Sequence, residues 1–305
     1  MTTTADYLAA LEAWKAKRLN NLKAPNGWLN IIGRFVLDPG TASVGAAEDN
    51  DIVLSAGPAH LGTVTQEPDG KVTFKPTDGE AIHITPNKKH PPKFQLGNLL
   101  CEITTVNGDN ALRIRDTASA APDAFPGIEY FPAQQHWRIT AQWVPFESPL
   151  EMDVDTTGNI RTGVAVTHKA VFTHEGKTYE LIATHGTPEA PQFVIRDPTS
   201  RDSTYPASRF LYGEEVTENS IVLDFNKAIN PPCAFTEFAV CPLPPPENVM
   251  PFRIEACDGC DVATCQVRHT MLNVRNAIAE VLDRTTLAQM RDASGEVLPL
   301  ELQTA

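Results

Sequence analysis

Apolar and polar residues follow a helical period at the start of the chain. Over residues 5–24 the spacing predicts one amphipathic helix, whose apolar stripe would consist of Leu8, Leu11, Leu19 and Leu22. Asp6 stands where it could cap the first turn. Pro25-Asn26-Gly27 then supplies the turn chemistry that ends a helix. We therefore predict a helical N-terminal segment over residues 1–27.

Between residues 28 and 115 the pattern changes to short apolar segments rich in β-branched residues. Gly, Pro, Asn and Asp separate these segments at close intervals, which is typical of a β-sandwich or barrel. The predicted strands lie in WLNIIGRFVL, NDIVL, GTVTQ, KVTFKP, AIHIT, CEITTV and ALRIRD. Residues 116–133 are rich in Ala and Pro, and they predict a connecting loop.

A second group of β patterns occupies residues 134–256. Its predicted strands lie in HWRITAQWVPF, VAVTHKAVFTHEGKTYELIATHG, QFVIRDP, SRFLY and SIVLDFN. Glu175-Gly176-Lys177 is predicted as the turn of a hairpin. Residues 227–256 are too rich in Pro for regular structure and too apolar for a solvated linker. We expect this Pro-rich loop to pack against the sheet.

The C-terminal part, residues 257–305, returns to a helical pattern over residues 262–291. An apolar stripe there consists of Met271, Val274, Ile278 and Val281. This stripe could pack on the β core or join two copies of the chain as a homodimer. The predicted fold class is thus mostly β, an antiparallel sandwich or barrel-like architecture with an N-terminal and a C-terminal helix.

Charge and hydropathy narrow the range of partners. The formal net charge is −13, which argues against nucleic acid and against an anionic membrane surface. The N-terminus lacks the long apolar core of a signal peptide, and no run approaches the roughly 20 apolar residues of a membrane span. We therefore expect a cytoplasmic protein whose six cysteines are thiols or metal ligands.

Three segments together resemble the DUF1684 family, whose members have no assigned function. They are GRFVLDPGTASVGAAEDNDIVL, FVIRDPTSRDSTYPASRFLY and LDFNKAINPPCAFTEFAVCPLPPPENVMPFRIEA. The resemblance extends over residues 8–256, and the third segment is its most specific part. It implies a fold and points to a site, but it implies no activity. Cys257 stands where this family typically has Gly.

The first of these segments also resembles part of a forkhead-associated β-sandwich. Gly45 and the run Asn50–Leu54 fit that pattern. Ala46 stands where that family usually has Arg, and Pro58-Ala59-His60 replaces its Ser-Arg-x-His. Phosphothreonine binding depends on such Arg and Ser donors. We therefore expect a shared strand arrangement without phosphopeptide binding.

Arg209 and Asp224 are the first candidate site residues. If SRFLY and SIVLDFN pair around a loop at residues 213–220, Arg209 faces Asp224 and Asn226 joins them on one surface. A guanidinium in that position could orient a small anionic ligand. In the alternative interpretation, the Arg–Asp pair only clamps the Pro-rich loop by binding its carbonyl groups.

The Pro-rich loop contributes Asn230, Cys233 and Cys241 to this candidate ligand site. A catalytic cysteine requires a nearby base and a lowered pKa, and no histidine is adjacent in the sequence. The two cysteines could instead be small apolar groups that fill a tight loop. The sequence does not decide whether the protein is an enzyme, a binding protein or a non-catalytic interaction protein.

A cysteine cluster follows the Pro-rich loop. Its potential ligands are Cys257, Cys260, Cys265 and His269. The order Cys-x2-Cys-x4-Cys-x3-His suits a tetrahedral zinc ion. Only one Cys-x-x-Cys pair is present, so a redox-active pair and inert buried thiols stay open as alternatives to zinc.

Overall fold

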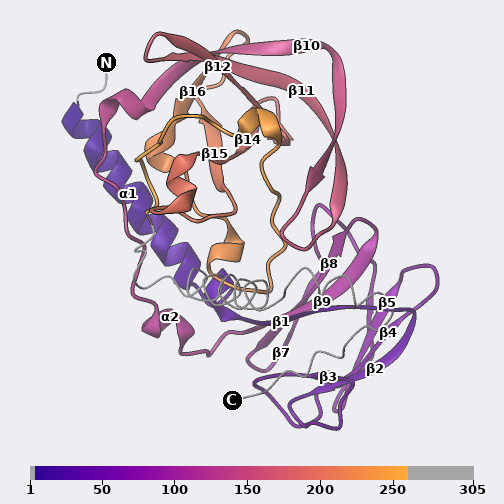
Figure 1. The fold of residues 1–305 in the computed structure, drawn as a ribbon. Coiled ribbons are helices and arrows are strands. Elements are labelled where there is room, and N and C mark those ends of the chain that lie inside the picture. The colour runs from indigo at the N-terminus through magenta and orange to yellow at the C-terminus, as the bar shows by residue number, and fades with distance from the viewer. Residues whose placement is uncertain (1–3, 260–305) are drawn as a thin grey trace, which may run out of the picture. The chain divides into compact units, whose positions relative to one another are not determined.

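The computed structural model describes residues 4–259 of the 305-residue chain. This part is mostly β, as predicted, with three open sheets and one long helix, α1 (Thr4–Lys23) (Figure 1). All strand pairs except one are antiparallel; the parallel pair joins β2 and β3. The predicted C-terminal helix, and with it the homodimer interface, lies outside the described residues.

Helix α1 buries a different stripe from the one predicted. Leu11 and Leu22 are buried, whereas Leu8 is 42% exposed. The buried face consists of Tyr7, Leu11, Trp14, Arg18 and Leu22. Their separations of four, three, four and four residues keep them on one side of a helix. The expected cap is wrong as well, because the helix begins before Asp6, which lies within its first turn.

The turn after α1 depends on a glycine. Helix α1 ends at Lys23, and the Gly27 N–H donates to the carbonyl of Ala24 at 2.6 Å. A Cβ at Gly27 would lie 2.3 Å from the carbonyl oxygen of Leu22, so only glycine fits this close approach. The Pro25-Asn26-Gly27 turn is therefore where the sequence predicts it.

Residues 31–116 form a β-sandwich of two sheets. One sheet has the order β1-β9-β8-β7 and the other has the order β3-β2-β4-β5-β6. The strands are β1 (Ile31–Val36), β2 (Gly40–Gly45), β3 (Ile52–Val53), β4 (Gly62–Gln66), β5 (Val72–Pro76), β6 (Ile82–Ile84), β7 (Lys93–Leu96), β8 (Leu99–Val106) and β9 (Asp109–Asp116). Their inward side chains form one apolar core around Phe74, Ile103 and Leu112. Strands β2 and β7 were not predicted from the sequence.

The second β region is a seven-stranded sheet of order β12-β11-β10-β16-β15-β14-β13. Its strands are β10 (Arg138–Asp155), β11 (Arg161–His174), β12 (Lys177–Ile182), β13 (His185–Thr187), β14 (Ala190–Ile195), β15 (Arg209–Glu214) and β16 (Ser220–Asp224). The short helix α2 (Ala121–Ala124) lies in the loop before it. Trp137, Phe193 and Phe225 belong to the core on its buried face.

Strands β10 and β11 continue beyond the predicted segments as a long two-stranded ribbon (Figure 1). The predicted hairpin between β11 and β12 is confirmed, since His174 pairs with Lys177. Its turn residues Glu175 and Gly176 have φ values of 49° and 75°. Two successive left-handed residues match the right-handed twist of a hairpin.

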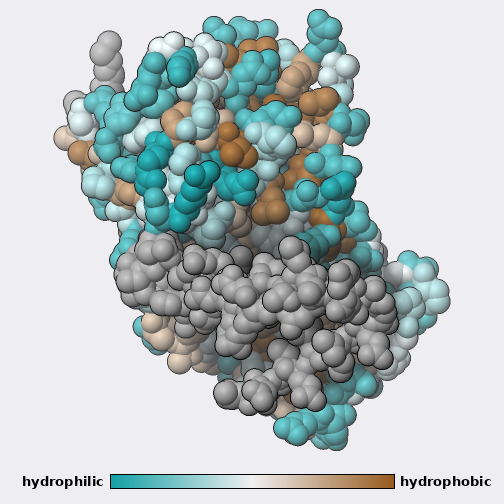
Figure 2. All heavy atoms as spheres, viewed as in Figure 1, coloured by the Kyte–Doolittle hydropathy of each residue, from teal (hydrophilic) through white to brown (hydrophobic). Residues whose placement is uncertain are grey.

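The visible face of the described residues mixes hydrophilic and hydrophobic side chains (Figure 2). Large exposed apolar residues are scattered, and they are Leu8, Val36, Val53, Leu150, Tyr212 and Val249. Scattered apolar residues of this kind are ordinary on a protein surface. Among the described residues, no helix has the length and hydropathy needed to cross a membrane.

Candidate functional site

Arg209 and Asp224 do not face each other, so the predicted pairing is wrong. Strands β15 and β16 do form a hairpin, but Glu214, rather than Leu211, pairs with Val222. This register differs by three residues, an odd number, and therefore puts Arg209 and Asp224 on opposite faces of the sheet.

A glycine explains the observed register. Gly213 has no side chain, and a Cβ at this position would lie 2.3 Å from Cδ1 of Ile221. The buried Ile221 side chain therefore occupies space that any other residue at position 213 would take. In the predicted register, Leu211 would pair with Val222, and this space would not be used.

Arg209 is a structural residue of the core. Its side chain is 1% exposed, and its Nη2 donates to Oδ1 of Asp197 at 2.8 Å. The same guanidinium donates to the carbonyls of Ala256 at 2.7 Å and Ile254 at 3.0 Å. The loop-clamping interpretation therefore describes Arg209, with Asp197 in the place predicted for Asp224.

Asp224 and Asn226 lie together, but their hydrogen bonds attach helix α1 and the loop at Gln134 to the sheet. Both carboxylate oxygens of Asp224 accept from the Tyr7 hydroxyl at 3.0 Å. Burial and the negative charge of Asp224 raise the pKa of Tyr7 above its usual value. The Asn226 amide donates to Asp224 and to the carbonyl of Gln134, at 3.2 and 2.9 Å. Asp224 is 0% exposed and lines neither of the two cavities described below.

Asn230 is the predicted candidate that does line a cavity. Its backbone N–H donates to Oδ2 of Asp258 at 2.7 Å. Asp258 is fully buried, and its two carboxylate oxygens also accept hydrogen bonds from the two terminal nitrogens of Arg18, each at 2.5 Å. The helix α1 arginine and the Pro-rich loop therefore meet at one carboxylate. This bidentate geometry is the strong form of an Arg–carboxylate pair.

The cavity at this junction has a volume of about 510 Å³, a size typical of small-molecule sites. We call it the aromatic pocket. Its aromatic walls are Trp28, Phe210, Tyr212 and Phe235, and its polar groups are Arg18, Asn21, Asn26 and Asn230. Tyr212 is 46% exposed, although large aromatic side chains are usually more buried.

A buried acceptor without a partner marks the aromatic pocket. Within residues 4–259, Oδ1 of Asn230 has no hydrogen-bond partner, although the residue is only 8% exposed. An unsatisfied buried polar group costs about 1–3 kcal/mol. Asn30 Oδ1 and Arg115 Nε share this property in the same range, but neither residue lines the pocket. Asn230 is thus a residue of the pocket lining whose buried side-chain oxygen has no partner among the described residues.

The aromatic pocket has little free charge. Among residues 4–259, Arg18 is the only charged residue that lines it, and Asp258 neutralises that charge. Trp28 makes cation–π contacts with the guanidinium groups of Arg113 and Arg115, which lie 5.0 and 5.9 Å from its ring centre. The arrangement suits a flat, uncharged molecule that donates a hydrogen bond.

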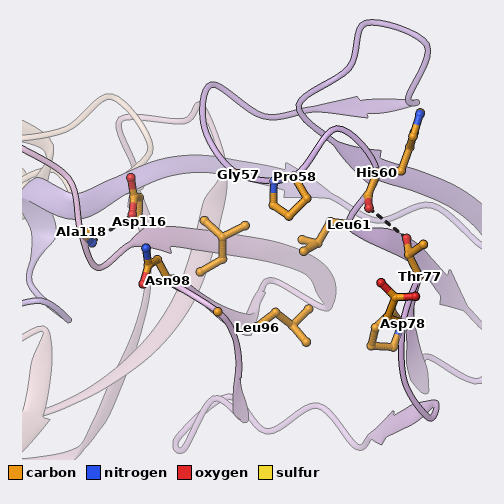
Figure 3. A pocket seen from close by; sticks show the side chains of 13 residues that line it. Gly57, Pro58, His60, Leu61, Thr77, Asp78, Leu96, Asn98, Asp116 and Ala118 are labelled. Carbon is orange, nitrogen blue, oxygen red and sulfur yellow. Dashed lines mark hydrogen bonds between the residues drawn. The ribbon is translucent and has the colours of Figure 1, made fainter.

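A second cavity of about 510 Å³ lies in the β-sandwich, where Pro58, Leu61 and Leu96 gather (Figure 3). Its polar lining is engaged locally, since the Thr77 hydroxyl donates to the carbonyl of His60 at 2.9 Å. Among the described residues, no buried side-chain atom without a partner lines this cavity. It therefore gives weaker grounds for a ligand site than the aromatic pocket.

Cys233 and Cys241 contact each other in the Pro-rich loop, which also carries Asn230. The Cys233 N–H donates to Sγ of Cys241 at 3.3 Å. Both residues pack with Trp28, Phe210 and Ile229, which also line the aromatic pocket. The two cysteines therefore pack against residues of the aromatic pocket, which Arg209 does not line, and their role in a ligand site with Asn230 stays a prediction.

Of the predicted zinc ligands, only Cys257 falls within the described residues. It is 2% exposed, and its thiol donates to Oδ1 of Asp258 at 3.4 Å. Burial raises the pKa of Cys257 well above its usual value. Its φ of 58° is one that glycine favours. Cys260, Cys265 and His269 lie outside the described residues, so the zinc and redox interpretations stay predictions.

Sequence reasoning missed the residues that build the aromatic pocket, namely Arg18, Trp28, Phe235 and Asp258. One signal was available for Arg18. It lies seven residues after Leu11 and four before Leu22, so a charged residue stands in the buried stripe of α1. A charge in such a stripe requires a buried partner.

Comparison with known proteins gives a family-model match over part of the chain and similarity to solved structures. Residues 123–258 match the family model described as "Protein of unknown function (DUF1684)". The match includes the seven-stranded sheet and the Pro-rich loop, but it begins well after residue 8, where we expected the resemblance to start. An uncharacterized protein of Haloarcula marismortui, solved by NMR, is 25% identical over 47% of this chain and 80% of its own, with a TM-score of 0.38. No curated protein matches the chain, and the forkhead-associated likeness stays a prediction.

Proposed function

We propose that the protein, whose residues 123–258 match the model of the DUF1684 family, binds a small uncharged ligand in the aromatic pocket. The observation that carries this proposal is the unpartnered Oδ1 of Asn230, 8% exposed in a pocket with four aromatic walls. A ligand that donates a hydrogen bond there would satisfy this acceptor, while its flat part would lie against the aromatic rings.

The charge of the pocket supports an uncharged ligand over the anionic one expected from the sequence. That expectation depended on Arg209, whose side chain is buried and fully engaged. Arg18 is bound to Asp258, so an anion would have to compete with a carboxylate held at 2.5 Å. An uncharged donor avoids this competition.

Indole is a suitable probe because it is flat, uncharged and has a single N–H donor. We expect titration by saturation-transfer NMR to show weak, saturable binding of indole to the full chain. Removing the donor in 1-methylindole should weaken binding about fivefold, the equivalent of about 1 kcal/mol for one hydrogen bond. Benzoate, an anion of similar size, should bind more weakly than indole. Equal binding of indole and 1-methylindole, or preferred binding of benzoate, would contradict the proposal.

The Phe235→Ala variant tests whether the aromatic pocket is the binding site. Phe235 lines the pocket, so its loss should reduce indole affinity by about fivefold or more, since a buried aromatic side chain contributes well over 1 kcal/mol of contact. Phe146→Ala is a matched control, because Phe146 is equally half-buried but lies on β10 beside Lys169. Affinity that falls equally in both variants would exclude this pocket as the site.

The Asn230→Leu variant separates ligand binding from stability. It removes the unsatisfied acceptor at similar volume, so we expect the free energy of unfolding in urea to stay the same or rise by about 1 kcal/mol. Indole affinity should fall to that of 1-methylindole. A residue that serves binding at the expense of stability is expected to behave in this way: its replacement lowers the affinity and leaves the free energy of unfolding equal or higher.

The control for Asn230→Leu is the same substitution at Asn248, which has no exposure and whose amide is fully bonded. Its Oδ1 accepts from Ile182 N–H at 2.8 Å, and its Nδ2 donates to the carbonyls of Ile182 and Val194 at 2.9 and 3.0 Å. Asn248→Leu should therefore lower the free energy of unfolding by about 1–3 kcal/mol. A similar loss at Asn230 would show that its side chain is structural.

A further inference from the structure

Two cysteines of the Pro-rich loop lie within reach of each other. The Cys233 N–H is 3.3 Å from Sγ of Cys241. Seven residues, several of them aromatic or apolar, separate the two positions, and the loop returns on itself between them. Cys241 is 3% exposed, whereas Cys233 is only half-buried. Cys233 is therefore the more exposed cysteine of the pair, and Cys241 is the buried one.

Polar side chains hydrogen-bond to the backbone of both cysteines. The Tyr205 hydroxyl is 3.0 Å from the carbonyl oxygen of Cys233, and the Thr157 hydroxyl accepts from the Cys241 N–H at 3.0 Å. In the described part of the chain, Cys241 and Tyr205 are the titratable groups that hydrogen-bond to Cys233. Their hydrogen bonds favour the charged form of Cys233, the thiolate.

Hydrogen bonds from Cys241 and then, against the effect of burial, from Tyr205 lower the pKa of Cys233 to about 7. The same interaction raises the pKa of Cys241, which keeps its proton. One thiolate beside one protonated thiol is the arrangement in which the first attacks an oxidant and the second resolves the product.

We propose that Cys233 and Cys241 form a peroxide-sensitive dithiol, in which Cys233 is oxidised first and Cys241 closes an intramolecular disulfide. This site is independent of the function proposed above. Because Pro232 and Phe235 line the aromatic pocket on either side of Cys233, closure of the disulfide would act on a wall of that pocket.

The chemistry balances with hydrogen peroxide as the oxidant. The Cys233 thiolate attacks one peroxide oxygen, the O–O bond breaks, an S–O bond forms, and the departing hydroxide takes a proton and leaves as water. Sulfur loses two electrons to the peroxide and becomes a sulfenic acid. The Cys241 sulfur then attacks the Cys233 sulfur, the S–O bond breaks, and hydroxide leaves with the Cys241 proton as a second water. A dithiol such as dithiothreitol reverses the disulfide by exchange.

Peptide mapping tests this proposal on the full chain. Trypsin cleaves after Lys227 and Arg253, so both cysteines fall in one peptide, residues 228–253. Reduced protein is treated with equimolar hydrogen peroxide, and remaining thiols are blocked with N-ethylmaleimide. We expect this peptide to be lighter by two hydrogen atoms and to carry no maleimide. After reduction with dithiothreitol and a second treatment with N-ethylmaleimide, it should carry two maleimides.

Cys101 is the internal control. It is fully buried, and burial raises its pKa to about 12, so it should stay reduced under the same peroxide treatment. In Cys241→Ser the disulfide cannot form, and the Cys233 sulfenic acid should be trapped by dimedone. Cys233→Ser should give neither product.

The pH dependence of alkylation checks the order of the two cysteines without any variant. Since the thiolate is the reactive form, the rate at Cys233 should rise with pH through a midpoint near 7. At pH 7 half of Cys233 would be ionised, roughly fifteenfold more than an ordinary thiol of pKa about 8.5. A peptide 228–253 that keeps two free thiols under peroxide, or a disulfide that involves a different cysteine, would overturn the proposal.

Discussion

Replacing Asp197 by Asn is expected to lower the free energy of unfolding by about 3–5 kcal/mol, because it leaves the buried Arg209 guanidinium without a counter-charge. Both side chains are 1% exposed. The carboxylate also accepts from the Ile254 N–H at 2.7 Å and the Thr199 hydroxyl at 2.8 Å, so the variant weakens the attachment of the Pro-rich loop as well. Urea unfolding at neutral pH measures the loss.

A surface ion pair supplies the control for this prediction. Asp202 binds Arg253 at 2.9 Å, but their side chains are 55% and 41% exposed. Asp202→Asn should cost at most about 1 kcal/mol, as exposed pairs do. In the double variant Asp197→Leu with Arg209→Met, much of the stability should return, because no buried charge is left alone. Equal losses at Asp197 and Asp202 would show that Arg209 is not held as described.

The second large effect is expected at Asp258, which holds helix α1 and the Pro-rich loop together. Asp258→Asn leaves Arg18 without its buried partner, and we expect a loss of about 3–5 kcal/mol. Hydrogen exchange of residues 4–23 should become faster, because Arg18 binds this helix to Asp258, as Tyr7 binds it to Asp224. Indole binding should weaken too, since Asp258 fixes the Asn230 backbone at 2.7 Å.

Glu12→Gln is the matched control on the same helix. Glu12 pairs with Lys15 at 2.8 Å, but its side chain is 70% exposed. Removing this charge should leave the free energy of unfolding within about 0.5 kcal/mol. If Asp258→Asn behaves like Glu12→Gln, helix α1 does not depend on the Arg18–Asp258 pair.

The strands of the fold were predictable from local patterns. Segments such as KVTFKP and ALRIRD alternate apolar and polar residues, and they form β5 and β9. The hairpin at Glu175-Gly176 was also predictable, because its turn requires left-handed residues. Strand β2 has the sequence GTASVG, which contains two glycines and few large apolar residues. Its β-strand propensity is therefore low, and the sequence did not predict it.

The candidate site was only partly predictable, because its contacts join residues far apart in the chain. The β15–β16 register depends on how Ile221 packs over Gly213, and the strand sequences alone allow several registers. Arg18 and Asp258 are 240 positions apart, so no local pattern pairs them. Asn230 was chosen because the Pro-rich loop is unusual, and its role in a ligand site stays a prediction; its unpartnered oxygen is visible only in three dimensions.

The central claim is that a donor ligand binds at Oδ1 of Asn230, and the side-chain amide signal of Asn230 reports this contact most directly. In ¹H–¹⁵N correlation spectra of the full chain, assigned through the Asn230→Leu variant, this signal and that of the Trp28 indole should shift with added indole. Both should move much less with 1-methylindole. If indole shifts residues of the β-sandwich cavity such as Asn98 and leaves Asn230 and Trp28 unchanged, the account of the aromatic pocket is contradicted.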